Sequence, residues 1–154
     1  PAGLAIAYVL REPAFDVLIN ADHLLGWGVT ADTLRDRAIG NLRAWSEMAP
    51  WSDEMQGDRR LLSSDTGEGG DAARILLVEV RRHLAGQCGG PARVLVALPD
   101  RDLLLAGSLQ PGDAEFAVQL TSFVTDVSDG AHEPIARSLF ELVGEEPELV
   151  PYAG

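Results

Sequence analysis

The side chains of this chain best suited to bind a ligand or to transfer a proton lie in predicted turns. Arg101 and Asp102 end the segment Pro99–Asp102, and His132 lies in a later loop. An arginine at a turn can hold a carboxylate or phosphate through two parallel hydrogen bonds, and a loop histidine can act as a general base. Charged loop residues are more often simply solvated or bonded to backbone, and we keep that interpretation beside the functional one.

A glycine-rich loop, Asp65–Gly70, precedes a predicted helix that begins at Asp71 and carries Arg74 near its start. Free backbone N–H groups at a helix start attract anions, so the loop is open to a phosphate-binding interpretation. Glu68 and Asp71 would both repel a phosphate there. We therefore favour a tight strand-to-helix turn in which Asp71 caps the helix.

Several other chemistries lack the residues that they need. All 12 basic residues are arginine, which removes a Walker-type phosphate loop, a Schiff base and a Ser–Lys dyad. The three histidines are scattered without metal-ligand spacing, and we expect neither a metal nor a cofactor. The single cysteine, Cys88, follows a predicted helix end, which favours a small buried side chain over a nucleophile.

Length, net charge and cysteine content limit the number of domains, the binding partners and the cellular location. The 154 residues suit one domain, 1–154, and their net charge of -12 opposes binding to nucleic acid or to an anionic membrane. The chain has no apolar run of 18 residues. One cysteine allows no internal disulfide, which fits a reducing, cytoplasmic location. Because the chain begins at Pro1 without a methionine, we expect processing or trimming.

The strands that must position these groups are predicted from apolar runs on either side of short polar breaks. Such runs predict hairpins over residues 4–20, 93–108 and 138–152, and a further strand over Arg59–Ser64. The stretch 51–58 is polar and is predicted to be irregular. Both strands of the middle hairpin are apolar on both sides, so we expect them at the centre of a sheet covered on both faces.

Three helices are predicted from apolar residues that recur three and four apart. Met48 and Phe123 belong to these stripes and are expected to be buried, and Trp27, between two glycines, is expected to turn into the core. The order of elements predicts an α+β fold, a mostly antiparallel sheet of hairpins with about three helices packed on it. The helices are expected from Thr30 to Pro50, from Asp71 to a C-cap at Gly86, and from Pro111 to Gly130.

Five sequence blocks, in this order along the chain, resemble the YtpQ-type family of bacterial proteins. The resemblance implies a cytoplasmic bacterial α+β protein and implies no particular reaction, substrate or cofactor. It points to Asn41, Asp71, Arg74, Pro99, Arg101, Asp102 and His132 as polar positions of the shared pattern. The blocks are Asn20–Val29 (NADHLLGWGV), Ala38–Leu42 (AIGNL), Gly70–Leu77 (GDAARILL), Leu98–Leu104 (LPDRDLL) and His132–Pro134 (HEP).

Two classes of function stay open at this point, and both require the sheet to bring distant segments together. The first is a non-enzymatic module that binds a partner protein or a small ligand. The second is a hydrolase- or transferase-like enzyme with His132 as base, Asp102 as orienting acid and Arg101 as anion clamp. A third possibility is a subunit of a larger assembly, with a contact patch near Trp51. The expected binding residues of the module are Asp71, Arg74, Arg101, Asp102 and His132.

Overall fold

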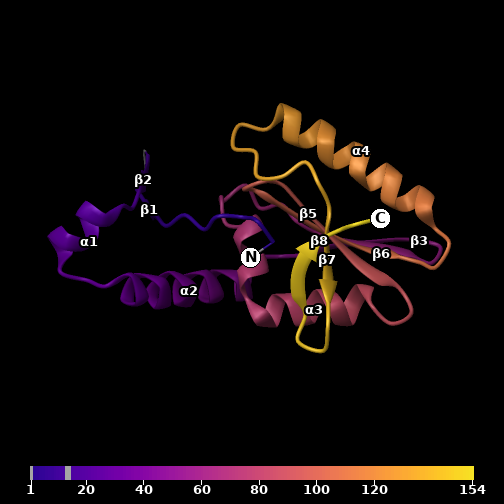
Figure 1. Cartoon of the computed structure of the whole chain (residues 1–154), viewed down its shortest axis with the longest axis horizontal. Helices are drawn as coiled ribbons and strands as arrows, with labels where there is room; N and C mark the ends of the chain where they lie inside the picture. Colours follow the sequence, from indigo (N-terminus) through magenta and orange to yellow (C-terminus); the bar gives the residue numbers. More distant parts are fainter. Residues whose placement is uncertain (1, 13–14) are drawn as a thin grey trace.

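A six-stranded antiparallel sheet forms the centre of the computed structural model, which describes residues 2–12 and 15–154 (Figure 1). The strand order is β3-β4-β6-β5-β7-β8, with β5 (Arg93–Asp100) and β6 (Leu103–Leu109) in the middle. Four α-helices accompany the strands, so the predicted α+β class is confirmed. The outer strands are β3 (Ser52–Gln56), β4 (Arg59–Ser64), β7 (Phe140–Val143) and β8 (Glu148–Pro151).

Helices cover both faces of the sheet, as the two-sided apolar pattern of the middle hairpin predicted. In β5, Val96 lies in one core cluster and its neighbour Leu95 lies in the other, because successive side chains of a strand point to opposite faces. The helix α3 (Val78–Cys88) packs against the first face, and α4 (Ala114–Gly130) packs against the second. Figure 1 shows these two helices on opposite sides of the sheet.

The N-terminal elements extend away from this sheet (Figure 1). They are a two-stranded antiparallel sheet of β1 (Val9–Arg11) and β2 (Asp16–Leu18), then the helix α1 (Ala21–Trp27), then the long helix α2 (Ala31–Met48). No described residue before Ser46 is buried. Among these elements, α2 packs against the first core cluster of the sheet through Ile39 and Leu42. We call residues 6–12 and 15–27 the N-terminal arm.

Local hydrogen bonds explain why the helices of this region begin where they do. Thr30 caps α2 as predicted, since its hydroxyl accepts from the Thr33 amide at 3.1 Å. Asn20 and His23 form a capping box at the start of α1, in which each side chain accepts from the other residue's amide. Gly28 ends α1 at a φ of +64°, a left-handed conformation that favours glycine.

The predicted helix from Asp71 to Gly86 is wrong at both ends. The chain first forms a short 3-10 helix, Ala72–Leu76, and turns at Leu77 before α3 begins. The side chain of Asp71 accepts no capping hydrogen bond from this helix, because its carboxylate is buried and accepts from the hydroxyls of Ser64 and Thr66. Gly86 lies inside α3, and Gly89 follows the helix end in its place.

Three predictions of burial are wrong. Trp27, Met48 and Phe123 are all exposed, and Phe123 lies beside the buried Val124 in the middle of α4, on a side of the helix that the sheet does not cover. The stretch predicted to be irregular before Arg59 contains the edge strand β3, whose five residues are all exposed. Its side chains give no apolar alternation, and its pairing with β4 holds it in the sheet. The hairpin tip is also tighter than predicted, since β5 continues through Pro99 to Asp100.

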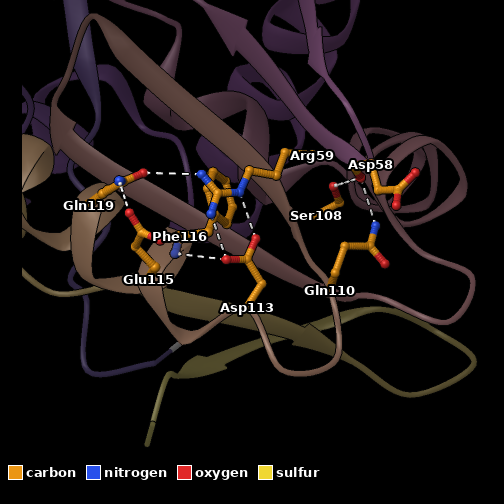
Figure 2. A network of polar contacts seen from close by, with 8 residues as sticks. All are labelled: Asp58, Arg59, Ser108, Gln110, Asp113, Glu115, Phe116 and Gln119. Carbon is orange, nitrogen blue, oxygen red and sulfur yellow. Dashed lines mark hydrogen bonds and ion pairs between the residues drawn. The ribbon is translucent and has the colours of Figure 1, made fainter.

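A polar network fastens the turn between β3 and β4 to the start of α4 (Figure 2). The guanidinium of Arg59 donates to both carboxylate oxygens of Asp113, at 2.7 and 2.6 Å, and stacks on Phe116. Asp113 also caps α4 by accepting from the amide of Phe116. Gln110 donates to the carbonyl of Asp58 on the other side of the turn. The network therefore fixes the position of α4 over the sheet.

Candidate functional site

Backbone hydrogen bonds bring three of the predicted site segments together at one end of the sheet. The amide of Ala72, next to Asp71, donates to the carbonyl of Arg101 at 3.1 Å. The amide of Arg101 in turn donates to the carbonyl of Glu133, next to His132, at 3.3 Å. The turn after β5, the end of the glycine-rich loop and the loop after α4 are thus neighbours. Their side chains, however, have different environments.

The carboxylate of Asp71 is buried and fully engaged with neighbouring hydroxyl groups. Ser64 of β4 donates to one carboxylate oxygen at 2.5 Å, and Thr66 donates to the other at 2.7 Å. The hydroxyl of Ser64 also accepts from the guanidinium of Arg74 at 2.6 Å. Ser64 therefore links the negative charge of Asp71 to the positive charge of Arg74 without direct contact between the two ions.

Arg74 is also buried, with 1% of its surface exposed, and its side chain lies at the C-terminal end of the helix α2. Its guanidinium donates to the backbone carbonyls of Ser46, Ala49 and Pro50, at 3.1 to 3.3 Å. Carbonyls at a helix end have no partner within the helix, so a buried arginine there supplies the missing donors. The guanidinium also stacks 3.9 Å above the ring of Trp51. Burial lowers the pKa of Arg74, and the nearby charge of Asp71 opposes that effect.

Arg101 remains partly exposed and joins the turn to the N-terminal arm. Its Nη1 donates to Asp16 of β2 at 2.9 Å, and its Nε lies 2.5 Å from the carboxylate of Glu133. Desolvation is the largest single effect on the pKa of Arg101 and lowers it, but the hydrogen bond to Asp16 and the charges of Glu133 and Asp16 together outweigh it and raise the pKa. Its charge is thus neutralised by two acidic neighbours, which leaves little attraction for an anionic ligand.

Asp102 and His132 take part in no shared acid–base pair. One carboxylate oxygen of Asp102 is buried without a hydrogen-bond partner among the described residues. His132 is exposed in the loop after α4. Within residues 2–12 and 15–154, no hydrogen bond or ion pair connects His132 to Asp102 or to Arg101. The proton-transfer arrangement proposed for an enzyme thus gains no support from the hydrogen bonds of this end of the sheet.

The glycine-rich loop is covered by side chains from the arm, the turn and α2. Gly69 has a φ of +72°, and a Cβ built on it would lie 2.4 Å from Arg11 and 2.9 Å from Arg101. Arg11 donates to the loop carbonyls of Glu68 and Gly69. The indole of Trp45 donates to the Glu68 carboxylate at 2.6 Å. Because Arg11 binds two of its carbonyls and Arg101 lies against Gly69, this loop does not present the open row of amides that a phosphate requires.

The polar groups that join the arm to the rest of the chain form a seam, which we define as Arg11, Asp16, Glu68, Arg101 and Glu133. Arg11 lies 3.5 Å from Asp16, its cross-strand neighbour, and Arg101 binds the same carboxylate from the other side. Three acidic and two basic groups therefore share this small area. Sequence reasoning did not find Arg11 and Asp16, because their partners are 57 and 85 residues away in the chain.

The surface of the N-terminal arm is unusually apolar. Leu25 is 80% exposed, and Phe15 and Leu18 are 63% and 62% exposed. Of the thirteen large apolar side chains that are exposed among the described residues, seven belong to the arm. The remaining six are spread over the rest of the chain. The arm members are Ile6, Val9, Leu10, Phe15, Leu18, Leu25 and Trp27.

A small cavity of about 150 Å³ lies between α2 and α3, away from the seam. Trp51 and His83 form part of its wall, with ring centres 5.7 Å apart, and the ion pair of Arg43 with Glu79 closes one side. The face of Trp51 is already occupied by Arg74. This tryptophan therefore anchors α2 to the sheet, and the contact patch predicted near it stays a prediction.

Among residues 2–12 and 15–154, no group of three or more His, Cys, Asp or Glu side chains is arranged to hold a metal ion. None of the described helices combines the length and the apolar character needed to cross a membrane.

Fold and surface together define an α+β protein with an antiparallel sheet covered on both faces and an apolar N-terminal arm. Comparison of the chain with models of known protein families, with curated proteins and with solved structures gave no match. The resemblance to the YtpQ-type family therefore stays a prediction, and the function must be argued from the surface itself.

Proposed function

We propose that this chain is a non-enzymatic protein-binding module and that its docking surface is the N-terminal arm. The observation that supports this proposal is the concentration of exposed apolar side chains in β1, β2 and α1. Soluble proteins rarely leave such side chains clustered in water unless a partner covers them. The resemblance and the single cysteine support a location in the bacterial cytoplasm.

The elements of the arm are also too small to be stable alone. An isolated two-stranded hairpin is marginal in water, and a helix as short as the seven residues of α1 does not form by itself. The contacts that hold the arm to the sheet are the polar contacts of the seam. A partner that buries the apolar side of the arm would stabilise its fold as well as bind it.

The proposed surface extends across the seam to the turn that the sequence identified. Arg101 contacts the arm directly through Asp16, and His132 is exposed one residue away from Glu133 in the same neighbourhood. We assign Arg101, Asp102 and His132 to the border of the docking surface. The buried Asp71 and Arg74 support that border from inside the fold.

A capture experiment with matched surface variants tests the proposal. Leu18→Ser combined with Leu25→Ser removes apolar surface from the arm, and Val118→Ser removes a side chain of similar exposure, 68%, from α4. Each protein is cross-linked in a bacterial lysate, and the captured proteins are identified by mass spectrometry. We expect the arm variant to lose a captured protein that the Val118 variant retains, with melting temperatures close to that of the unchanged chain. Identical capture by all three proteins would refute an arm-based docking function.

A further inference from the structure

The strand β2 ends a sheet of two strands and has an edge that no other described strand occupies. β1 and β2 pair only with each other. The amide of Ile19 donates to Tyr8 at 2.8 Å, and the amide of Glu12 donates to Phe15 at 3.1 Å, so these positions face the partner strand. In an antiparallel ladder alternate residues face outward, which places the N–H and C=O groups of Asp16 and Leu18 on the outer edge.

The outer edge of β2 is more accessible than that of β1. Phe15 and Leu18 are each more than 60% exposed, whereas Val9 in β1 is 43% exposed. Asp16 is already paired with Arg11 and Arg101, whereas the guanidinium of Arg11 at β1 stays half exposed. A strand that brings positive charge would therefore meet repulsion from Arg11 at the outer edge of β1.

Net charge favours a basic partner over a second copy of this chain. Each copy carries a net charge of -12, so two copies repel each other as they approach. The arm itself contains one arginine against Glu12, Asp16 and Asp22, and it is therefore acidic as well. The same field accelerates the approach of a basic segment and orients it on encounter.

We propose that a basic, extended segment of a partner protein adds to the outer edge of β2 as a third strand, with lysine or arginine alternating with apolar residues. This inference rests on the docking function proposed for the arm and specifies how the partner binds. Backbone hydrogen bonds to Asp16 and Leu18 supply the pairing, as in other cases of strand addition. Apolar side chains on one face of the added strand contact Leu18, and its cationic side chains lie on the opposite face, which is the face of Glu12.

Short peptides with blocked ends test this proposal directly. The probe is a seven-residue peptide of alternating valine and lysine, added to the intact chain while backbone amide signals are followed by nuclear magnetic resonance. We expect slower hydrogen exchange at the amides of Asp16 and Leu18, with no change at those of Val9 and Arg11. Two matched peptides serve as controls, one with glutamate in place of lysine and one with N-methyl groups on the pairing edge. Both should bind at least tenfold more weakly.

Equal binding of the glutamate peptide, equal binding of the N-methylated peptide, or protection at Val9 and Arg11 would each overturn strand addition at β2. So would an absence of binding at millimolar peptide. Dimer formation without peptide, detected by sedimentation and accompanied by protection of Leu18, would identify a second copy as the occupant and would also overturn the inference. Failure of the peptides alongside successful arm-dependent capture leaves the docking function standing, so the two failures are distinguishable.

Discussion

Replacing Arg74 with alanine is expected to destabilise the fold strongly. The guanidinium donates five hydrogen bonds, three to the carbonyls of Ser46, Ala49 and Pro50 and two to the hydroxyls of Ser46 and Ser64. Arg74→Ala removes all of these donors at once. The carbonyls at the end of α2 then face a space that no side chain fills, and Asp71 loses the cation that balances its charge.

The size of the effect follows from what is left unpaired. A buried polar group without a partner costs about 1–3 kcal/mol, and the removal of one partner of a buried charge pair costs about 3–5 kcal/mol. Part of this loss is offset, because the variant no longer buries a charged guanidinium. We therefore expect Arg74→Ala to lower the free energy of unfolding by about 4 kcal/mol, a large part of the 5–15 kcal/mol typical of such a domain.

Urea denaturation followed by tryptophan fluorescence and circular dichroism measures this loss. The control is Arg137→Ala, which removes an arginine of an exposed ion pair with Asp129 and should change stability little. Ser64→Ala supplies a second test, because Ser64 connects Arg74 to Asp71. Its cost and that of Arg74→Ala should add to more than the cost of the double variant. A loss below about 1 kcal/mol for Arg74→Ala would refute the structural role given to this arginine.

Two further predictions concern groups whose pKa values the fold changes. Burial raises the pKa of Cys88 to about 11, so iodoacetamide at pH 8 should modify the native protein much more slowly than the urea-unfolded protein, as read by mass spectrometry; equal rates would contradict its burial. The hydrogen bond from Arg59 lowers the pKa of Asp113. Its contribution to stability is therefore present above the unfolded pKa and is lost as pH falls through the folded pKa. Melting temperatures between pH 5 and 2 should fall less steeply for Asp113→Asn than for the unchanged chain, and identical slopes would contradict a stabilising bond between Arg59 and Asp113.

The central sheet could be predicted because its signals are local and agree with one another. The strands over 93–108 are apolar on both sides, which is the pattern of a sheet covered on both faces, and α4 lies within the helix range predicted from Pro111 to Gly130. The edge strand β3 could not be predicted in the same way. All five of its residues are exposed, so its position depends on backbone hydrogen bonds to β4. Such bonds do not require apolar residues at alternate positions, and the sequence therefore shows no strand pattern there.

The sequence predicted correctly which segments lie next to one another at the candidate site. It did not predict which of their side chains are free to bind a ligand. The turn at Arg101, the helix start near Asp71 and the loop at Glu133 do share backbone hydrogen bonds. Whether a polar side chain binds a ligand or supports the fold depends on its burial and on its partners, and those partners are distant in sequence. Arg74 is the clearest case, since the carbonyls that it binds lie 24 to 28 residues away.

The exposure of the apolar residues in the arm could not be predicted from the sequence either. Residues 4–20 have the composition of a buried hairpin, and Phe15 and Leu18 would be core residues if a helix or a second sheet lay over them. Apolar pattern predicts that a surface needs to be covered, but it does not identify the covering element. The helices α3 and α4 cover the central sheet, whereas the short α1 leaves both residues more than 60% exposed. Removal of these side chains from water is favourable by about 25 cal/mol per Å² of apolar surface. A partner strand that adds beside β2 would therefore gain binding free energy by burying surface that this chain leaves exposed.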